Sequence, residues 1–460
     1  MISKTLQQAF AGMVGADNVM ADPADLATYS YDAAVVAPAT PALVVRPTTA
    51  EALSGTVKLC NENGLPLTVR GAGTNLSGGT IPAQTGVVIL TNGMNQILEI
   101  NEADMYAVVQ PGVVTAKFAA AVEAKGLFYP PDPGSQAVST LGGNVAENAG
   151  GLRGLKYGVT ADYVMGLQFF DTGGDPVKTG SRTVKCATGY NLTGLMVGSE
   201  GTLGVFNEIT LKLIPKPTAR KAMTAVFDRV ETASETVARI ISARIIPATL
   251  EFMDNFTIRA VEAYSKAGLP TDAAAMLLVE LDGHPAQVAE DADRVEAICQ
   301  EMGASAVRVA ADDAERDKVW AARRAALSAL AKLKPTLVLE DATVPRSKIP
   351  EMVRAMREIS KEYDIPIGTF GHAGDGNLHP TILTDKRDTA EWARVEKAID
   401  AIFDRALAMG GTLSGEHGTG IAKSCYLEGE TSAATIVLSR RVKQALDPNN
   451  ILNPGKIIGG

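Results

Sequence analysis

The chain has 460 residues, of which 46% are hydrophobic and 21% are charged, and its formal net charge is −9. This length exceeds one ordinary hydrophobic core, so two or three domains are expected. The negative charge argues against nucleic acid as a partner, because binding phosphate groups requires a basic surface. No apolar run reaches the roughly 20 residues of a membrane helix, and no apolar stretch typical of a signal peptide follows Lys4. We expect a cytoplasmic protein.

The four cysteines, at positions 60, 186, 299 and 425, are far apart and form no CxxC pair. This spacing argues against a disulfide framework or an iron–sulfur cluster within the chain. We expect each cysteine to be a small buried apolar residue.

The first half of the chain alternates short strands with helices. Thr48 and Glu51 are spaced as a capping box, and apolar residues then recur at helical spacing as far as Cys60. Strands are expected at 65–69, 87–90 and 106–110, and a further helix from Thr115 to about Gly126.

The segment Pro215-Lys216-Pro217 interrupts any regular structure, because proline ends both helices and central strands. We place the end of the first domain there. Beyond it, helical patterns over 293–302 and 314–333 alternate with strand-like runs at 276–280 and 336–339. This alternation predicts an α+β domain with helices packed on one face of an antiparallel sheet.

A glycine-rich loop, Arg70-Gly-Ala-Gly-Thr-Asn-Leu-Ser-Gly-Gly79, follows the strand expected at 65–69. Such a loop lets backbone N–H groups approach a diphosphate closely. A GxGxxG fingerprint fails because Leu76 stands three residues after Gly73, and a P-loop fails because Gly79 stands where its lysine would be. A flexible loop without a ligand remains the alternative for this segment taken alone.

The loop is one of several motifs that occur together. Pro130-Pro-Asp-Pro-Gly-Ser-Gln136, Thr140-Leu-Gly-Gly-Asn144, Asn148-Ala-Gly-Gly151, Val197-Gly-Ser-Glu-Gly-Thr-Leu-Gly-Val205 and Leu452-Asn-Pro-Gly-Lys456 follow it in order. With this set the chain resembles the vanillyl-alcohol oxidase superfamily, in the branch of D-lactate dehydrogenase and the D-type glycolate oxidase subunit. The match covers nearly the whole chain.

The resemblance implies a two-subdomain α/β FAD-binding domain at 1–217, of the vanillyl-alcohol oxidase (PCMH) type. It also implies a substrate (cap) domain at 218–420, with an antiparallel sheet covered by helices, and a segment at 421–460 that returns to the FAD domain. The implied FAD contacts are Arg70, Gly71, Ala72, Gly73, Thr74, Asn75, Ser77, Gly78, Pro131, Asp132, Gly134, Ser135, Thr140, Gly142, Gly143, Asn148, Gly151, Gly158, Glu200, Gly201 and Asn453. The first loop holds no histidine or cysteine for a covalent link, so we expect non-covalent FAD.

Three of the four histidines lie in two glycine-rich motifs, Gly371-His-Ala-Gly-Asp-Gly-Asn-Leu-His-Pro380 and Ser414-Gly-Glu-His-Gly418. The turn at 374–377 can reverse the chain, so that His372 and His379 would face each other. Two imidazoles and a carboxylate are a common ligand set for a catalytic divalent metal. The alternative is a pair of buried, hydrogen-bonded histidines. The resemblance makes His372, His379 and Glu416 the ligands of zinc, manganese or iron, and His417 the base. The fourth histidine, His284, precedes a proline in an ordinary turn and is expected to be exposed.

This residue set suits the oxidation of a 2-hydroxy acid, in which the hydroxyl loses a proton and C2 gives hydride to flavin N5. A bound metal lowers the pKa of an oxygen ligand, and histidine suits the role of proton acceptor. The family's carboxylate-binding arginine matches Arg323, and Asn377 is a second candidate donor; a solvated helix arginine is the alternative reading of Arg323.

Relatives that oxidise 2-hydroxyglutarate carry a threonine and a lysine where this chain has Leu327 and Leu339. A second buried carboxylate would be unpaired against two leucines, so D-lactate or glycolate is favoured as substrate. Two other functions stay open: a carbon–oxygen bond-forming enzyme like alkylglycerone-phosphate synthase, and a non-catalytic flavin electron-transfer subunit. The family passes electrons to quinones, cytochromes, iron–sulfur subunits or electron-transfer flavoproteins. A partner of this kind could hold the protein at the inner face of the membrane, and a homodimer is also compatible with the sequence.

Overall fold

The computed structural model describes residues 2–459. They fold into two compact units. The first comprises the chain up to Gly150, Val159–Lys216 and the chain from Glu416 onward, and the second comprises Gly151–Gly158 and Pro217–Gly415.

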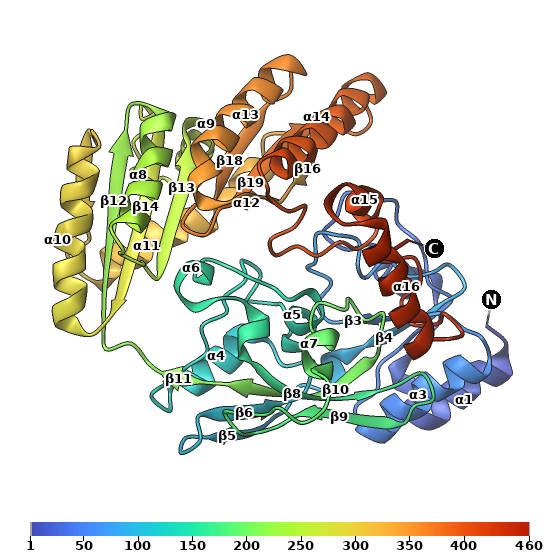
Figure 1. The fold of residues 1–460 in the computed structure, drawn as a ribbon. Helices are drawn as coiled ribbons and strands as arrows, with labels where there is room; N and C mark the ends of the chain where they lie inside the picture. The colour runs from blue at the N-terminus through green and yellow to red at the C-terminus, as the bar shows by residue number, and fades with distance from the viewer. Residues whose placement is uncertain (1, 460) are drawn as a thin grey trace. The chain divides into compact units, whose positions relative to one another are not determined.

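The first unit contains a four-stranded sheet in the order β1-β2-β4-β3. Strands β2 (Leu43–Val45), β4 (Val87–Leu90) and β3 (Leu67–Arg70) are parallel, and β1 (Val19–Met20) is antiparallel to β2. Helices α1 (Lys4–Val14) and α3 (Ala50–Glu62) pack against each other beside this sheet (Figure 1). The strands and helix expected in this region are confirmed. The N-cap of α3 is Thr49 and not Thr48, because the Thr49 hydroxyl accepts the hydrogen bond from the Ala52 N–H at 3.2 Å.

The C-terminal segment runs along the edge of the same sheet. The N–H of Leu67 donates to the carbonyl of Ile451 at 2.7 Å, and the N–H of Asn453 donates to the carbonyl of Leu67 at 2.7 Å. Leu67 and Leu452 thereby form a parallel bridge. Backbone groups of the strand edge are satisfied in this way, as buried backbone must be.

A second, five-stranded sheet of the first unit is antiparallel, in the order β5-β6-β10-β8-β9. Its strands are β5 (Ile97–Asn101), β6 (Tyr106–Val109), β10 (Val205–Lys212), β8 (Val164–Phe170) and β9 (Pro176–Gly180). A short pair joins β7 (Leu127–Phe128) to β11 (Ile214–Pro215). The other helices of this unit are α2 (Pro23–Ala27), α4 (Thr115–Glu123), α5 (Leu141–Glu147), α7 (Leu192–Met196), α15 (Leu427–Glu430) and α16 (Ala433–Leu446).

The second unit is built on one antiparallel sheet in the order β15-β12-β14-β13-β18-β19-β16, with β17 paired to β19. The strands are β12 (Ala219–Phe227), β13 (Thr249–Asp254), β14 (Ala275–Gly283), β15 (Ala306–Val309), β16 (Thr336–Leu339), β17 (Ala342–Thr343), β18 (Ile367–His372) and β19 (Asn377–Thr384). The expected runs at 276–280 and 336–339 are therefore strands, as predicted.

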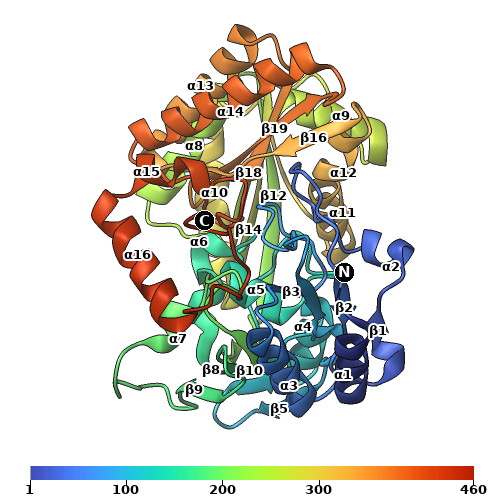
Figure 2. The same ribbon diagram turned by 90° about the vertical axis from the view of Figure 1, so that its right-hand side faces the viewer.

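Helices cover both faces of this sheet, whereas the sequence pattern suggested one face. Figure 2 shows α8 (Val230–Ser242), α13 (Ile349–Glu362) and α14 (Thr389–Ala408) on one side and α9 (Asn255–Ser265), α11 (Asp313–Arg324) and α12 (Ala326–Ala331) on the other. The physical reason lies in the central strands, since every residue of β18 and β19 is buried. A strand buried on both faces needs a cover on each. Helix α10 (Pro285–Glu301) packs on β12 and β14, and α6 (Gly154–Tyr157) completes the unit.

Candidate metal centre and flavin-binding loops

His372 and His379 stand on the two strands of one hairpin in the second unit. Strand β18 ends at His372 and β19 begins at Asn377, and the register pairs His372 with Asn377 and Phe370 with His379. The turn needs Gly376, which has a φ of +95° and whose Cβ position would clash with the Val344 carbonyl. The two imidazole rings lie edge to face with centroids 5.0 Å apart, so the predicted hairpin geometry is present.

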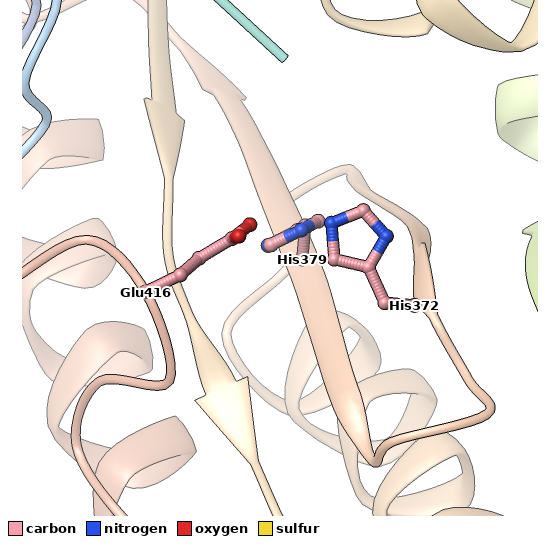
Figure 3. Close-up of side chains that lie close together, drawn as sticks. All are labelled: His372, His379 and Glu416. Carbon is pink, nitrogen blue, oxygen red and sulfur yellow. The ribbon is translucent and has the colours of Figure 1, made fainter. Parts of the chain in front are cut away.

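Glu416 directly follows the last residue of the second unit. The carboxylate of Glu416 and one ring nitrogen each of His372 and His379 lie within 4.8 Å of one another, and Figure 3 shows the carboxylate pointing toward the rings. Both histidines are buried and Glu416 is half-buried. Two neutral imidazoles and a carboxylate in a buried site are a donor set that fits a divalent ion, so the predicted ligands fit the group expected there.

A buried carboxylate stands behind His372. Glu251 on β13 is fully buried, and its Oε1 lies 2.7 Å from Nδ1 of His372. Its Oε2 accepts a hydrogen bond of 2.7 Å from Nε of Arg323 on α11. Burial alone would raise the pKa of Glu251, but Arg323 and His372 more than offset it and hold that pKa below its ordinary value. Sequence reasoning missed Glu251, because its only local signal is its place in a strand.

Arg323 is buried and not a solvated helix residue. Its side chain is 7% exposed, and its guanidinium lies over the Phe370 ring, 4.7 Å from the centroid. One turn earlier on α11, Trp320 donates from Nε1 to the carboxylate of Glu280 at 2.7 Å. The helix is therefore fixed to the sheet face that also carries Glu251.

Further buried polar groups lie at β19 and at its neighbour β17, on the edge of the hairpin that faces away from β13. Asn377 is 6% exposed, and its side-chain oxygen has no hydrogen-bond partner among the described residues. Asp341 is fully buried and accepts a hydrogen bond of 2.8 Å from the Ser414 hydroxyl. Since Ala342 pairs with Leu378 on the neighbouring strand, the antiparallel register places Asp341 across from His379. Sequence reasoning missed Asp341 as a member of this cluster.

The segment 151–158 packs against the turn of the hairpin. A Cβ at Gly374 would meet the Leu155 side chain, and a Cβ at Gly154 would lie 2.7 Å from an Asp375 carboxylate oxygen. Lys156 donates to the side chain and the carbonyl of Asp282, each at 2.6 Å. Gly151 and Gly158, expected as flavin contacts, thus belong to the second unit, while the other expected FAD residues belong to the first.

Buried polar side chains form hydrogen bonds in and around the first glycine loop. Arg70 is buried and donates to the Tyr31 carbonyl at 2.8 Å and to the Thr80 hydroxyl at 3.2 Å. Asp32, which sequence reasoning missed, accepts from the Asn75 amide at 2.6 Å and from the Thr80 N–H at 3.3 Å. These contacts give residues 71–79 a defined shape, which argues against the flexible-loop alternative.

The second glycine-rich region meets the first loop. A Cβ at Gly71 would clash with the hydroxyl of Thr140, the N-cap of α5. Gly71, Ala72 and Thr140 also line a cleft of about 580 Å³. Its remaining lining residues were absent from the predicted set and include Asn92, Asn95, Gln96, Lys117 and Val138. A glycine-edged cleft between a strand-following loop and a helix start fits the backbone-rich cradle that a dinucleotide needs.

Glu200 forms hydrogen bonds with the backbone of the segment that follows His417. Its carboxylate accepts hydrogen bonds from the N–H groups of Thr419 at 2.7 Å and Gly420 at 2.8 Å. A Cβ at Gly418 would lie 3.0 Å from the Glu200 carboxylate and would clash with that of Glu147. Burial raises the pKa of both carboxyl groups, and the charge of Glu200 raises the pKa of Glu147 further. The predicted base His417 itself lies 4.0 Å from the Glu416 carboxylate and is 9% exposed.

Several expected FAD residues adopt left-handed backbone. Among the non-glycine members, φ is +53° at Asn148, +51° at Glu200 and +43° at Asn453, and Gly73, Gly78 and Gly201 also have positive φ. Such conformations in residues with a side chain are costly and cluster at functional sites. Pro131 and Asp132 are buried and Gly134 is exposed. Thr74 and Ser77 lie in the first glycine loop, Ser135 lies in the turn before Thr140, and Gly142 and Gly143 lie in the first turn of α5.

The cysteine prediction is half wrong. Cys60 and Cys299 are buried, and burial raises the pKa of each thiol to about 12. Cys186 and Cys425 are exposed, because each lies in a surface segment where apolar side chains such as Val184 and Ile421 are exposed as well. His284 is exposed as expected and caps α10.

The length and apolar content of a helix decide whether it could span a membrane. Within residues 2–459, no helix combines the length and apolar character needed to span a bilayer.

Comparison with known proteins agrees with the motifs. A family model described as FAD linked oxidases, C-terminal domain, matches residues 216–457, and one described as FAD binding domain matches residues 41–180. The glycolate oxidase subunit GlcD of Bacillus subtilis is 50% identical over 457 residues, covering 99% of this chain and 97% of that protein. A D-lactate dehydrogenase of Anaerostipes hadrus is 37% identical, covering 92% and 91%.

Among solved structures, p-cresol methylhydroxylase with substrate bound matches with a TM-score of 0.82 at 19% identity, covering 99% of this chain and 96% of that chain. Alkyldihydroxyacetonephosphate synthase matches with a TM-score of 0.77 at 19% identity, covering 99% and 86%. At these identities the likeness concerns the fold alone, and it confirms the expected α+β, vanillyl-alcohol oxidase type of fold. The chain therefore belongs to the family of FAD-linked oxidases, in the branch of the GlcD subunits of glycolate oxidase and the D-lactate dehydrogenases.

Proposed function

We propose that this protein oxidises a short D-2-hydroxy acid, D-lactate or glycolate, to the 2-oxo acid with FAD and a divalent metal. The observation that carries the proposal is the joint placement of His372, His379 and Glu416 within 4.8 Å, with buried Arg323 held beside His372 by Glu251. The names of the relatives, glycolate oxidase subunit and D-lactate dehydrogenase, point to the same substrates.

Each residue has a distinct task in this proposal. His372, His379 and Glu416 would hold zinc, manganese or iron, which supplies a Lewis acid that acidifies the substrate hydroxyl. FAD, bound non-covalently by the loops of the first unit, supplies the hydride acceptor. His417 takes the hydroxyl proton, Arg323 holds the substrate carboxylate by charge-assisted hydrogen bonds, and Asn377 uses its buried amide to orient the substrate.

The charges of the site suit a monocarboxylate. Arg323 offers one guanidinium to one substrate carboxylate, while the buried carboxylates of Glu251 and Asp341 and the half-buried Glu416 disfavour a second one. Leu327 and Leu339 are half-buried members of one apolar cluster, and Leu339 pairs across the sheet with Thr381, two residues after His379. A second carboxylate against these leucines would lack a partner.

The division of labour along the chain follows from the same proposal. Residues 1–217 bind FAD, residues 218–420 bind the substrate and metal, and residues 421–460 return to the FAD domain. We infer a cytoplasmic protein whose electrons pass to a quinone or to a partner protein, either an iron–sulfur subunit, an electron-transfer flavoprotein or a cytochrome. The word subunit in the names of its relatives is consistent with such a partner.

Anaerobic mixing with D-lactate or glycolate tests the proposal. The flavin absorption bands of the metal-loaded protein should bleach with either acid and should stay unchanged after chelation. A carbon–oxygen bond-forming enzyme or a non-catalytic electron-transfer subunit would show no bleaching with these acids, and that result would refute the proposal.

A further inference from the structure

Glu251 is placed to serve two functional groups at once. It lies on β13, which pairs with β18 of the histidine hairpin, and it is fully buried. Oε1 contacts Nδ1 of His372 at 2.7 Å, and Oε2 contacts Nε of Arg323 at 2.7 Å and Nη2 at 2.5 Å. Each oxygen of the carboxylate therefore has its own partner.

These contacts decide which atoms remain for ligands. A carboxylate that contacts Nδ1 keeps the imidazole proton on that nitrogen. Nε2 of His372 is then the atom that would coordinate the metal. On the other side, Nε and one N–H of Nη2 of Arg323 are engaged by Glu251, so Nη1 and the second N–H of Nη2 can donate to a further acceptor. Rotation of either side chain away from its ligand would break a buried charge-assisted hydrogen bond.

We propose that Glu251 is a positioning residue that couples metal binding at His372 to substrate-carboxylate binding at Arg323. This inference rests on the proposed function and adds a member that the sequence motifs did not mark. One carboxylate orients both His372 and Arg323. Its loss should therefore weaken metal binding and substrate-carboxylate binding together, and it should leave the FAD loops of the first unit unchanged.

The test uses Glu251→Gln in the full-length, FAD-containing protein. Zn²⁺ affinity is measured by competition with a chromophoric chelator, and pyruvate affinity by the perturbation of the flavin spectrum in the Zn²⁺-saturated protein. We expect Zn²⁺ binding to weaken roughly 10–100-fold and pyruvate binding to weaken at least about tenfold, with unchanged FAD content.

Glu280→Gln is the matched control. Glu280 is also buried, and it lies on the same face of the same sheet, but it accepts its hydrogen bond from Trp320 and contacts neither His372 nor Arg323. The glutamine oxygen can still accept from Trp320 and keep α11 in place, so the Zn²⁺ and pyruvate affinities of this variant should stay near those of the unmodified protein. If Glu251→Gln behaves like this control, the inference is overturned.

A second pair of variants covers the case in which Glu251→Gln does not fold, since it leaves Arg323 buried without a counter-charge. Arg323→Met is compared with the double variant Glu251→Gln/Arg323→Met, and neither contains the cation. Zn²⁺ should bind roughly 10–100-fold more weakly to the double variant; equal affinities would refute the role of Glu251.

The unmodified protein separates the two levels of failure. If it binds no Zn²⁺ and neither hydroxy acid bleaches its flavin, the proposed function fails and this inference falls with it. If it binds Zn²⁺ and is reduced, but the Glu251 variants match their controls, only the positioning role is refuted.

Discussion

The side-chain amide of Asn453 donates a hydrogen bond of 2.7 Å to the backbone carbonyl of Glu200. The same nitrogen donates to the carbonyl of Gly79 at 2.8 Å, and the amide oxygen accepts from the Thr68 hydroxyl at 3.1 Å. Within the first unit, one side chain near the end of the chain thus joins the first glycine loop to the Glu200 segment. Its amide is used by these protein contacts, while a contact with the flavin stays a prediction.

Replacement of Asn453 by alanine should destabilise the first unit. Two buried carbonyls would lose a donor, and alanine would have to adopt a φ of +43°, so a loss of roughly 2–4 kcal/mol is expected. Asn450→Ala is the control, because Asn450 is exposed and has a φ of +49°. It should cost about 1 kcal/mol, from backbone strain alone. Denaturant unfolding measures both variants, and equal losses would contradict the role of the buried amide.

Loss of any one metal ligand should abolish turnover and leave FAD bound. His372→Ala, His379→Ala and Glu416→Ala should each resemble the chelated protein, because the FAD loops lie in other segments of the chain. Activity with a dye acceptor, metal content and flavin absorbance are the measurements. His284→Ala, at an exposed helix cap, should stay active. Active protein that contains no zinc, manganese or iron would disprove the ligand assignment.

Substrate length and charge should both affect kcat/KM. D-lactate and 2-hydroxybutyrate should both be oxidised well, because Leu327 and Leu339 offer apolar surface to the far end of the substrate. An added methylene there should change the free energy that corresponds to kcat/KM by only ~1–3 kcal/mol. 2-Hydroxyglutarate should be oxidised poorly, and Leu327→Thr/Leu339→Lys should shift the preference toward it. The series is measured with a dye acceptor, and a preference of the unmodified protein for 2-hydroxyglutarate would refute the leucine pocket.

FAD should be released by acid or heat. The residues of the first glycine loop contain neither histidine nor cysteine, so no covalent link is expected there. After denaturation and centrifugation, flavin absorbance in the supernatant should correspond to one FAD per chain. Yellow protein in the pellet would show a covalent link elsewhere in the chain.

Asp254 should make the stability of the second unit depend on pH. Burial raises the pKa of Asp254 to about 6, although the N–H groups of Thr257 and Thr369, which donate to its carboxylate at 2.8 Å each, lower it. Because the folded pKa exceeds the unfolded one, its contribution is fully present below pH ~4 and is lost as the pH rises to about 6.

Comparison with Asp254→Asn isolates this effect. The difference in unfolding free energy, unmodified protein minus variant, should fall by on the order of 1–3 kcal/mol between pH 4 and 7 and then stay constant. Denaturant unfolding across this range is the measurement. A difference that stays constant or rises with pH would contradict the raised pKa.

The sequence by itself determined the family and the local hairpin, and it predicted which glycine-rich loops bind FAD. Glycine at 376 and the spacing of His372 and His379 require only short-range geometry, because a turn and a two-residue side-chain period bring the rings together. The strands at 87–90 and 336–339 were likewise predictable from their apolar runs.

Only the tertiary structure decided which side chains form hydrogen bonds with the predicted site residues. Glu251 and Arg323 are 72 residues apart in the chain, and Asp32 and Asn75 are 43 apart. Nothing in the local pattern of Glu251 distinguishes it from an exposed strand glutamate, since periodicity reports the face of a strand and not its long-range partner. The partner is set by the order of strands in the sheet and by the helix packed over it, and a buried carboxylate is tolerated only where that packing supplies a cation or a hydrogen-bond donor.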